Sequence, residues 1–198
     1  AAEHRFSHAD ACAWYAQGAA AISAARVEAG RPLLVGVFQD QSAAEINGAV
    51  EQAGLDLVQL HGSEPPELAD ALSVPALRVL HIDPAAGAGE AAAAAVLRDA
   101  LVHAGHAIGL LLDTATAGAQ GGTGVAFDWA LAARVGRELP VLVAGGLSGE
   151  NVSEAVRAAC PCWGVDASSG LESAPGVKDG ARVDAYVKAA KAAVNVAA

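Results

Sequence analysis

The sequence predicts an α/β fold in which a parallel sheet is buried on both faces. Short apolar runs of strand length alternate with longer periodic segments along the 198 residues, and the runs are continuously apolar. One run and one periodic segment together repeat about every 30 residues, the size of a strand–helix unit in an eight-stranded βα barrel. Glycine and polar residues gather where the apolar runs stop, which is the edge where such proteins bind ligands.

Strands are expected where a short run rich in aliphatic residues is bounded by turn residues. Such runs are continuous rather than alternating, as in strands covered by helices on both sides. The expected strands are Leu33–Phe38, Leu57–Leu60, Ala76–Ile82, Ala107–Leu112, Val141–Ala144 and Trp163–Val165.

Helices are expected between these strands, with one more helix ahead of the first strand. Ser7 is placed to cap the first helix, and Ser42 followed by Glu45 forms the pattern of a capping box. Ser148 is expected to open another helix. The expected helices are Ala9–Ala29, a helix from Ser42, Glu64–Leu72, Glu90–Ala104, Asp128–Leu139, Glu150–Ala159 and Ala181–Val194.

The composition predicts one globular domain over residues 1–198. Apolar residues make up 54% of the chain and charged residues 17%, and no linker is evident. Twelve basic and 22 acidic residues give a net charge of −10 without a basic stripe, which argues against a nucleic-acid partner. A phosphate group must therefore be held by local amide dipoles more than by side-chain charge. No apolar stretch is long enough for a membrane span, so no membrane partner is expected.

The cysteines point to a reducing compartment. Cys12, Cys160 and Cys162 are an odd set without a disulfide framework, and residues 1–7 are too polar for a secretory signal. We therefore expect a cytoplasmic protein. The Cys-x-Cys pair has no ligand partners at suitable spacing, so we expect small buried apolar residues there and no metal site.

Three strand ends carry the candidate functional residues. Asp113 follows an apolar run that would favour the uncharged form of its carboxyl group, although a strand-end aspartate can also merely cap a loop or helix. Gly145-Gly146 and Ser168-Ser169-Gly170 suit amide-lined turns around an anion, or simply tight turns. His61 also ends a strand, and a role in the site and a role in packing are equally open.

In their order and spacing, these motifs resemble the phosphoribosylanthranilate isomerase family. The resemblance extends from about Arg31 to the C-terminus. It is carried by Leu34–Phe38, Val58–Gly62, Leu111–Asp113, Gly121–Gly124 with Phe127–Trp129, Ala144–Leu147 with Glu150–Val152, Gly164–Glu172 and Gly176–Asp179.

The resemblance implies an eight-stranded (β/α)8 TIM barrel without cofactor. It implies an Amadori rearrangement of N-(5-phosphoribosyl)anthranilate to 1-(2-carboxyphenylamino)-1-deoxyribulose 5-phosphate, in tryptophan biosynthesis. An acid opens the sugar ring, and a base then removes the C2 proton from the resulting imine.

The family's site residues match positions of this chain one by one. Asp113 matches the general acid, and Asp166 matches a residue that faces the anthranilate or sugar part of the substrate. His61 lies in the family's most recognisable peptide, and Arg5 matches a substrate contact only weakly. The phosphate cradle and a loop that closes near it match Gly145, Gly146, Ser168, Ser169, Gly170, Gly121 and Gly122.

The family's first strand, first helix and second strand have no match in this sequence. They would amount to roughly 45 residues and would include a Lys-x-Cys-Gly segment whose cysteine is the general base. Cys12 is expected on a helix and does not replace it. We therefore expect open apolar edges at Leu33–Phe38 and Trp163–Val165, and a chain that binds a phosphorylated ligand better than it turns one over.

Two alternatives and one association remain open at this point. One alternative is another phosphosugar barrel isomerase, such as the related enzyme of histidine biosynthesis, which pairs two aspartates. The other is a truncated or degenerate barrel that binds a phosphosugar without turnover. Some members of the resembled family are fused to other tryptophan-pathway modules, so fusion or association with such modules is a further expectation.

Overall fold

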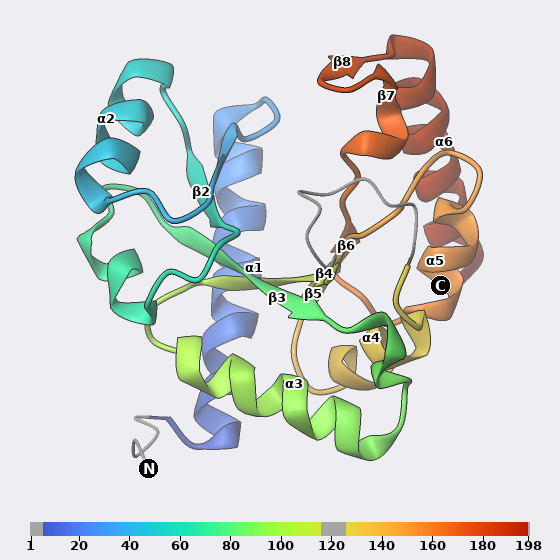
Figure 1. Cartoon of the computed structure of the whole chain (residues 1–198), viewed down its shortest axis with the longest axis horizontal. Coiled ribbons are helices and arrows are strands. Elements are labelled where there is room, and N and C mark those ends of the chain that lie inside the picture. Colours follow the sequence, from blue (N-terminus) through green and yellow to red (C-terminus); the bar gives the residue numbers. More distant parts are fainter. Residues whose placement is uncertain (1–5, 116–125, 198) are drawn as a thin grey trace. The chain divides into compact units, whose positions relative to one another are not determined.

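The computed structural model describes residues 6–115 and 126–197. These residues fall into two compact units, one formed by residues 6–80 with 96–111 and the other by residues 81–95 with 112–115 and 126–197. Figure 1 labels the elements of both units.

The strands form one six-stranded sheet with the order β1-β2-β3-β4-β5-β6. The registered pairs β1·β2, β2·β3 and β5·β6 all run parallel. This confirms the predicted α/β fold. The observed strands are β1 (Val35–Phe38), β2 (Leu57–Leu60), β3 (Ala76–Ile82), β4 (Gly109–Thr114), β5 (Val141–Val143) and β6 (Gly164–Val165). Of the two predicted edge strands, β1 is the more exposed, and Val37 keeps 61% of its surface.

The first unit begins with α1 (His8–Ala29), which Ser7 caps as predicted; Ser7 and Asp10 also form a capping box that was not predicted. The helix packs against residues 100–108, which lead into β4. The Trp14 indole N–H donates to the Ala107 carbonyl at 2.7 Å, and the Tyr15 hydroxyl donates to the Ala100 carbonyl at 2.8 Å. A Cβ atom at Gly18 would lie 1.9 Å from the Ile108 carbonyl oxygen. Only glycine therefore lets the two backbones approach this closely.

The next helices of the first unit differ in type. The α2 helix (Ala43–Ala53) starts with the predicted Ser42 capping box and packs its buried residues against β2 and β3. The predicted α-helix over Glu64–Leu72 is wrong, because the segment is a 3₁₀-helix, η1 (Pro66–Ala71). Glu64 and Pro65 each precede a proline, which disfavours the α conformation at both residues, and Pro65 is extended with ψ 148°. The chain therefore cannot begin an α-helix at Glu64.

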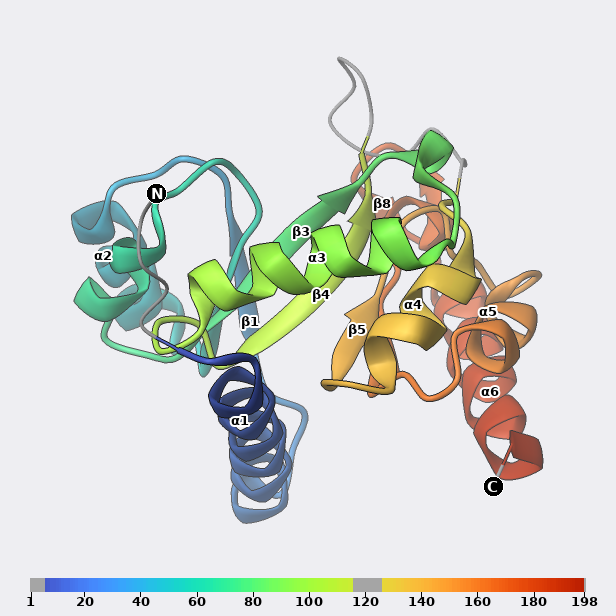
Figure 2. The ribbon, with the colours of Figure 1, turned by 90° about the horizontal axis from the view of Figure 1, so that it is seen from below.

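The second unit contains most of the C-terminal elements. A 3₁₀-helix, η2 (Pro84–Ala86), and α3 (Glu90–His103) follow β3, and the chain passes between the units within α3. Figure 2 shows α4 (Trp129–Gly136) beside β5 and close to α5 (Val152–Ala158). The α5 helix starts two residues later than predicted, with Asn151 rather than Ser148 at its cap.

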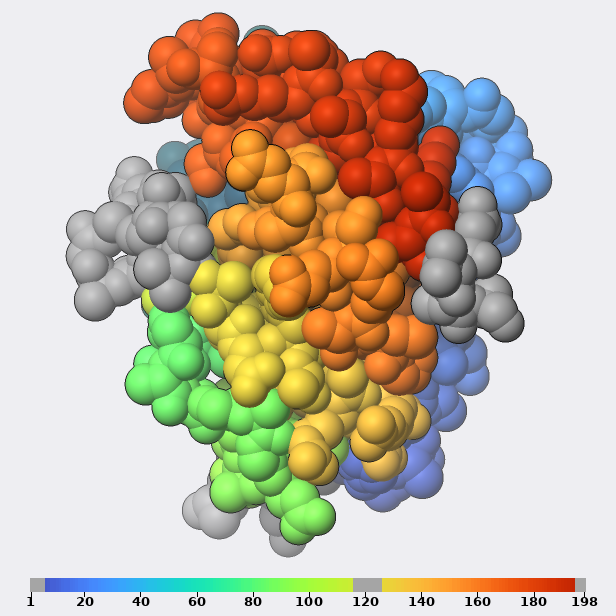
Figure 3. Space-filling view, turned by 90° about the vertical axis from the view of Figure 1, so that its right-hand side faces the viewer, coloured from blue at the N-terminus to red at the C-terminus, as the bar shows by residue number. Residues whose placement is uncertain are grey.

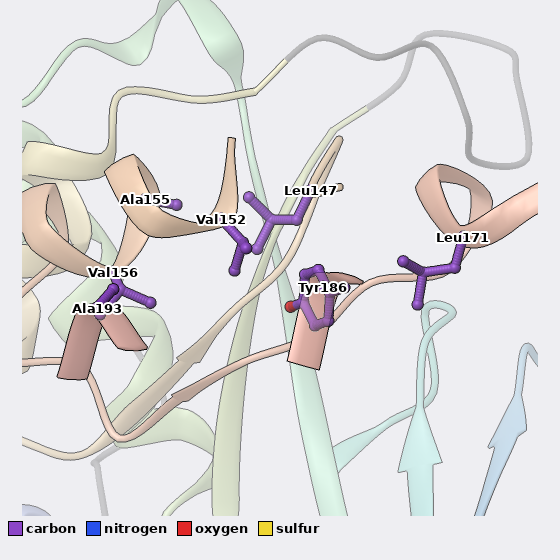
Figure 4. Packing of buried hydrophobic residues seen from close by; sticks show 7 residues of the cluster. All are labelled: Leu147, Val152, Ala155, Val156, Leu171, Tyr186 and Ala193. Carbon is purple, nitrogen blue, oxygen red and sulfur yellow. The ribbon is translucent and has the colours of Figure 1, made fainter. Parts of the chain in front are cut away.

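The last elements of the second unit are η3 (Ser169–Leu171), the strands β7 (Glu172–Ala174) and β8 (Val177–Lys178), and α6 (Gly180–Ala197). The hairpin of β7 and β8 was not predicted, because its strands are short and exposed. Figure 3 shows α6 in dark red packed beside the orange α5. Between them lies an apolar cluster that includes Leu147, Val152, Leu171 and Tyr186 (Figure 4).

None of the helices among the described residues combines the length and the apolar character that a membrane span would need.

Candidate active site

The candidate site of the second unit begins at the end of β4. Leu110, Leu111 and Leu112 are buried, and Asp113 is half-buried directly after them. The backbone N–H of Thr114 donates to Asp113 Oδ1 at 2.8 Å. This hydrogen bond orients the carboxyl group at the carboxyl end of the strand, where the sequence placed the candidate acid.

The turn after β5 lies directly against this strand end. The Ala144 N–H donates to the Leu112 carbonyl at 2.8 Å, and Gly145 follows with φ +88°. A Cβ atom at position 145 would lie 2.3 Å from Thr114 Oγ1 and 2.9 Å from Asp113 Oδ1. The tight-turn interpretation of this glycine is therefore confirmed, since the turn needs a positive φ, and the close approach to Thr114 and Asp113 leaves no room for a side chain.

The side chain of Asn151 holds the glycine turn in its conformation through two hydrogen bonds. Asn151 Nδ2 donates to the Gly146 carbonyl at 2.9 Å, and the Ser148 N–H donates to Asn151 Oδ1 at 2.8 Å. The turn after β6 packs on top of it, because a Cβ atom at Gly170 would lie 2.1 Å from the Leu147 carbonyl oxygen. The turns that follow β5 and β6 are thus in contact, as a shared anion cradle requires.

The remaining predicted residues of this unit follow β6. Asp166 is exposed, and its N–H donates to the Val143 carbonyl at 2.8 Å. Ser168 and Ser169 are also exposed. The sequence analysis missed Tyr186, whose hydroxyl is buried without a hydrogen-bond partner in the described part of the chain. Burial, followed by the charge of Asp166, raises the pKa of Tyr186 well above its ordinary value.

The sequence analysis also did not single out His81, which follows Leu80 on β3. One of its ring nitrogens lies within 4.8 Å of an Asp113 carboxylate oxygen. The one signal in the sequence is that His81 interrupts the apolar run close to the carboxyl end of β3.

In the first unit, His61 follows β2, and its Nδ1 lies 3.2 Å from Gln59 Nε2. Behind it, a buried ion pair holds the turn: Arg78 Nη1 donates to Glu64 Oε2 at 2.7 Å, and Arg78 Nη2 donates to the Gly62 carbonyl at 2.8 Å. Glu64 also accepts from the Gly62 N–H at 3.0 Å. The sequence analysis missed this clamp, although an arginine inside an apolar strand predicts a buried acidic partner.

Three predicted residues cannot be placed. Gly121, Gly122 and Arg5 lie outside the described residues.

The three cysteines lie in the described part of the chain, and none of them is at the carboxyl end of a strand. Cys12 is on α1, and Cys160 and Cys162 precede β6. The expectation that the Cys-x-Cys pair is buried is wrong, because Cys160 is exposed and Cys162 is only partly buried. Burial raises the pKa of the Cys162 thiol.

Together, the parallel sheet and the contiguous strand-end turns define an α/β protein with its candidate site at the carboxyl edge of the sheet. The model of the family described as N-(5'-phosphoribosyl)anthranilate isomerase matches residues 12–189. The chain belongs to this family. The predicted isomerase of tryptophan biosynthesis is thereby confirmed at the level of the family.

Named relatives agree with the family match. A tryptophan biosynthesis protein of Phytophthora nicotianae is 48% identical over 169 residues, which cover 84% of this chain and 31% of that protein. The N-(5'-phosphoribosyl)anthranilate isomerase of Myxococcus xanthus is 46% identical over 174 residues, which cover 87% of this chain and 77% of that enzyme.

Solved structures agree as well. The phosphoribosyl anthranilate isomerase of Thermotoga maritima has a TM-score of 0.66 and 29% identity, covering 84% of this chain and 78% of that one. A phosphoribosyl anthranilate isomerase in complex with reduced 1-(o-carboxyphenylamino)-1-deoxyribulose 5-phosphate has a TM-score of 0.61 and 28% identity, covering 80% of this chain and 71% of that one.

Proposed function

We propose that this chain carries the phosphate cradle and the proton donor for the Amadori rearrangement of N-(5-phosphoribosyl)anthranilate to 1-(2-carboxyphenylamino)-1-deoxyribulose 5-phosphate. Asp113 is the general acid of this proposal. Gly145, Gly146 and the turn Ser168–Gly170 bind the phosphate through their amides, and Asp166 faces the rest of the substrate.

One observation carries the proposal, namely the contact between the glycine turn and the acid. The position of a Cβ atom at Gly145 is 2.9 Å from Asp113 Oδ1. In the substrate, the furanose ring oxygen and the ester oxygen of the phosphate are separated by only two carbons. A proton donor for that ring oxygen must therefore lie directly beside the amides that hold the phosphate, and the close approach of Gly145 to Asp113 supports this arrangement.

Asp113 acts first in the proposed sequence of steps. Its protonated carboxyl group gives the proton to the furanose ring oxygen, the C1–O bond breaks, and the nitrogen lone pair forms the protonated imine. Removal of the C2 proton then gives an enolamine, which tautomerises to the product ketone. The Thr114 amide, which donates to Asp113 Oδ1 at 2.8 Å, holds the carboxyl group in one orientation for this step.

Removal of the C2 proton needs a base, and the cysteines of this chain do not have the geometry for it. None of the three is at the carboxyl end of a strand, where this substrate would lie. We propose that the six strands correspond to strands three to eight of a (β/α)8 barrel, so that the base belongs to a strand outside these 198 residues. Binding without turnover is accordingly the alternative function of these residues by themselves.

Two further parts of the proposal concern the cellular location of the protein and its association with other proteins. The three free cysteines suit a reducing compartment, which supports a cytoplasmic location. Association or fusion with another module of the pathway is supported by the Phytophthora relative, of which the matched region is only 31%.

Binding of the reduced product analogue named above tests the cradle, and turnover tests the acid. Calorimetry should show that the chain binds the analogue and that Asp113→Asn leaves this binding within a few fold. The substrate, generated in situ, should lose its fluorescence in the presence of a chain extended by a cysteine-bearing first strand. In that extended chain, D113N should slow the decay at least 10²-fold.

The matched control is Asp184→Asn, because Asp184 lies on the exposed side of α6, in a pair with Lys188. This variant should turn over like wild type. An extended chain without turnover would overturn the isomerase proposal, whereas unchanged turnover in D113N would remove Asp113 from the mechanism.

A further inference from the structure

The segment Gly176–Asp179 matches the family, but the proposed function gives it no role. In the structure it forms the second half of the β7–β8 hairpin, in which Lys178 lies opposite Glu172. The hairpin directly follows the turn Ser168–Gly170 in the chain. It therefore connects the proposed phosphate cradle with α6.

Lys178 turns back onto the cradle. Its Nζ donates to Ser168 Oγ at 3.1 Å, to the Ser168 carbonyl at 2.9 Å and to Glu172 Oε1 at 2.7 Å. Three acceptors match the three N–H bonds of an ammonium group. The ammonium group thus uses two of its N–H bonds on Ser168 and the third on Glu172.

The contact with Ser168 Oγ determines what the hydroxyl group can do. A serine hydroxyl has one proton to donate and two lone pairs. Because Lys178 occupies a lone pair, the hydroxyl proton is left to point at an acceptor on another side, such as a phosphate oxygen. The bound ammonium also places a positive charge next to the cradle of a chain whose net charge is −10.

The surrounding contacts keep the hairpin in register with the cradle. The Asp179 N–H donates to the Leu171 carbonyl at 2.8 Å, and Asp179 Oδ1 accepts from the Ala181 N–H at 2.8 Å at the start of α6. The Arg182 guanidinium donates to the Glu172 carbonyl. The hydrogen bond from Lys178, followed by that from the Gly176 N–H, lowers the pKa of Glu172, so the carboxylate stays charged and holds the lysine.

We propose that Lys178 is a positioning residue for phosphate binding: it sets Ser168 as a hydrogen-bond donor to the substrate phosphate. This inference rests on the proposed phosphate cradle. Lys178 does not touch the reacting atoms. Replacing it should therefore weaken the binding of phosphorylated ligands and leave the affinity for a ligand without phosphate unchanged.

The test compares two ligands, the reduced product analogue and the same molecule without its phosphate. Wild type should bind the phosphorylated form much more tightly. Lys178→Gln should weaken that form about fivefold, as expected for one partly exposed charged hydrogen bond, and leave the dephosphorylated form within twofold. Lys178→Arg should restore most of the loss, because it keeps a charged donor. Lys188→Gln, which removes the same charge from an exposed pair on α6, is the control and should bind both ligands like wild type.

A double-mutant cycle shows whether Lys178 acts through Ser168. Ser168→Ala should lose as much affinity for the phosphorylated ligand as K178Q, and the double variant should lose no more than S168A alone. Additive losses, or equal losses for both ligands in K178Q, would overturn the inference. If K178Q does not fold, S168A is the remaining test. The inference is then overturned if S168A prefers the phosphorylated ligand over the dephosphorylated one as strongly as wild type does. If wild type does not discriminate between the ligands, the proposed phosphate cradle is wrong.

Discussion

Gly145→Ala is the substitution that tests the geometry of the candidate site most directly. The added Cβ atom would lie 2.3 Å from Thr114 Oγ1, 2.8 Å from the Thr114 nitrogen and 2.9 Å from Asp113 Oδ1. All three distances are shorter than real Cβ contacts, and two of the atoms belong to the hydrogen bond that orients the carboxyl group. The alanine can therefore fit only if the glycine turn or the strand end moves.

The cost has two parts that can be estimated separately. A φ of +88° disfavours an alanine by about 1–2 kcal/mol. Overpacking at a closely packed position costs about 1–3 kcal/mol more. The free energy of unfolding should therefore fall by about 2–5 kcal/mol, and a loss of about 3 kcal/mol lowers the melting temperature by roughly 6–12 °C for a chain of this size.

Substitutions at three other glycines of the second unit measure backbone strain and overpacking separately. Gly176 has φ +77° and nothing within 4 Å of its Cβ position, so Gly176→Ala measures the backbone strain. Gly170→Ala measures a clash, with a Cβ position 2.1 Å from the Leu147 oxygen. Gly149→Ala makes only ordinary contacts, the nearest at 3.4 Å, and should be close to neutral.

The assays are thermal unfolding followed by circular dichroism and calorimetric titration with the reduced product analogue. G145A should be less stable than G176A and should bind the analogue at least tenfold more weakly, because displacement of a positioned group by about 1 Å is expected to be costly. If G145A has the same melting temperature as G149A and binds the analogue like wild type, the close approach of the turn to Asp113 does not exist in solution.

Two further predictions concern the first unit. Glu64→Gln should lower the free energy of unfolding by about 3 kcal/mol or more, because it leaves the buried Arg78 charge without its partner; a loss below about 1 kcal/mol in urea denaturation would show that the clamp is unimportant. Burial, followed by the charges of Arg78 and His106, lowers the pKa of His103 from 6.5 to about 4. Between these two pH values the unfolded chain therefore binds more protons than the folded chain. The free energy of unfolding should fall as the pH drops through this window. His103→Gln should remove about 1–2 kcal/mol of that decrease, after allowance for solvent screening of a partly exposed ring; urea midpoints of wild type and H103Q that decrease in parallel from pH 7 to pH 4 would contradict this assignment.

The local features of the fold could be predicted because they depend on neighbouring residues. Capping at Ser7 and Ser42 needs only a hydroxyl group and an acid three residues later, and both capping boxes form. The buried strands needed only short apolar runs. The expected α-helix over Glu64–Leu72 is wrong although the signal against it is also local, since Glu64 and Pro65 each precede a proline.

The candidate site was predicted as a set of residues but not as a geometry. The placement of Asp113 at a strand end followed from the apolar run before it, and the glycine turns followed from their positions after strands. Their mutual distances could not follow, since they depend on the register of neighbouring strands and on how the turns after β5 and β6 pack.

By itself, the sequence determined the alternation of strands and helices, the helix starts at Ser7 and Ser42 and the strand ends that carry glycine and acid, because backbone preference and burial pattern act over a few residues. Only the tertiary structure decided that Arg78 meets Glu64, that Gly145 touches the end of β4 and that Lys178 returns to Ser168. Each of these contacts joins groups 10 or more residues apart. Their formation depends on the free energy of the whole packed chain, which no local pattern contains.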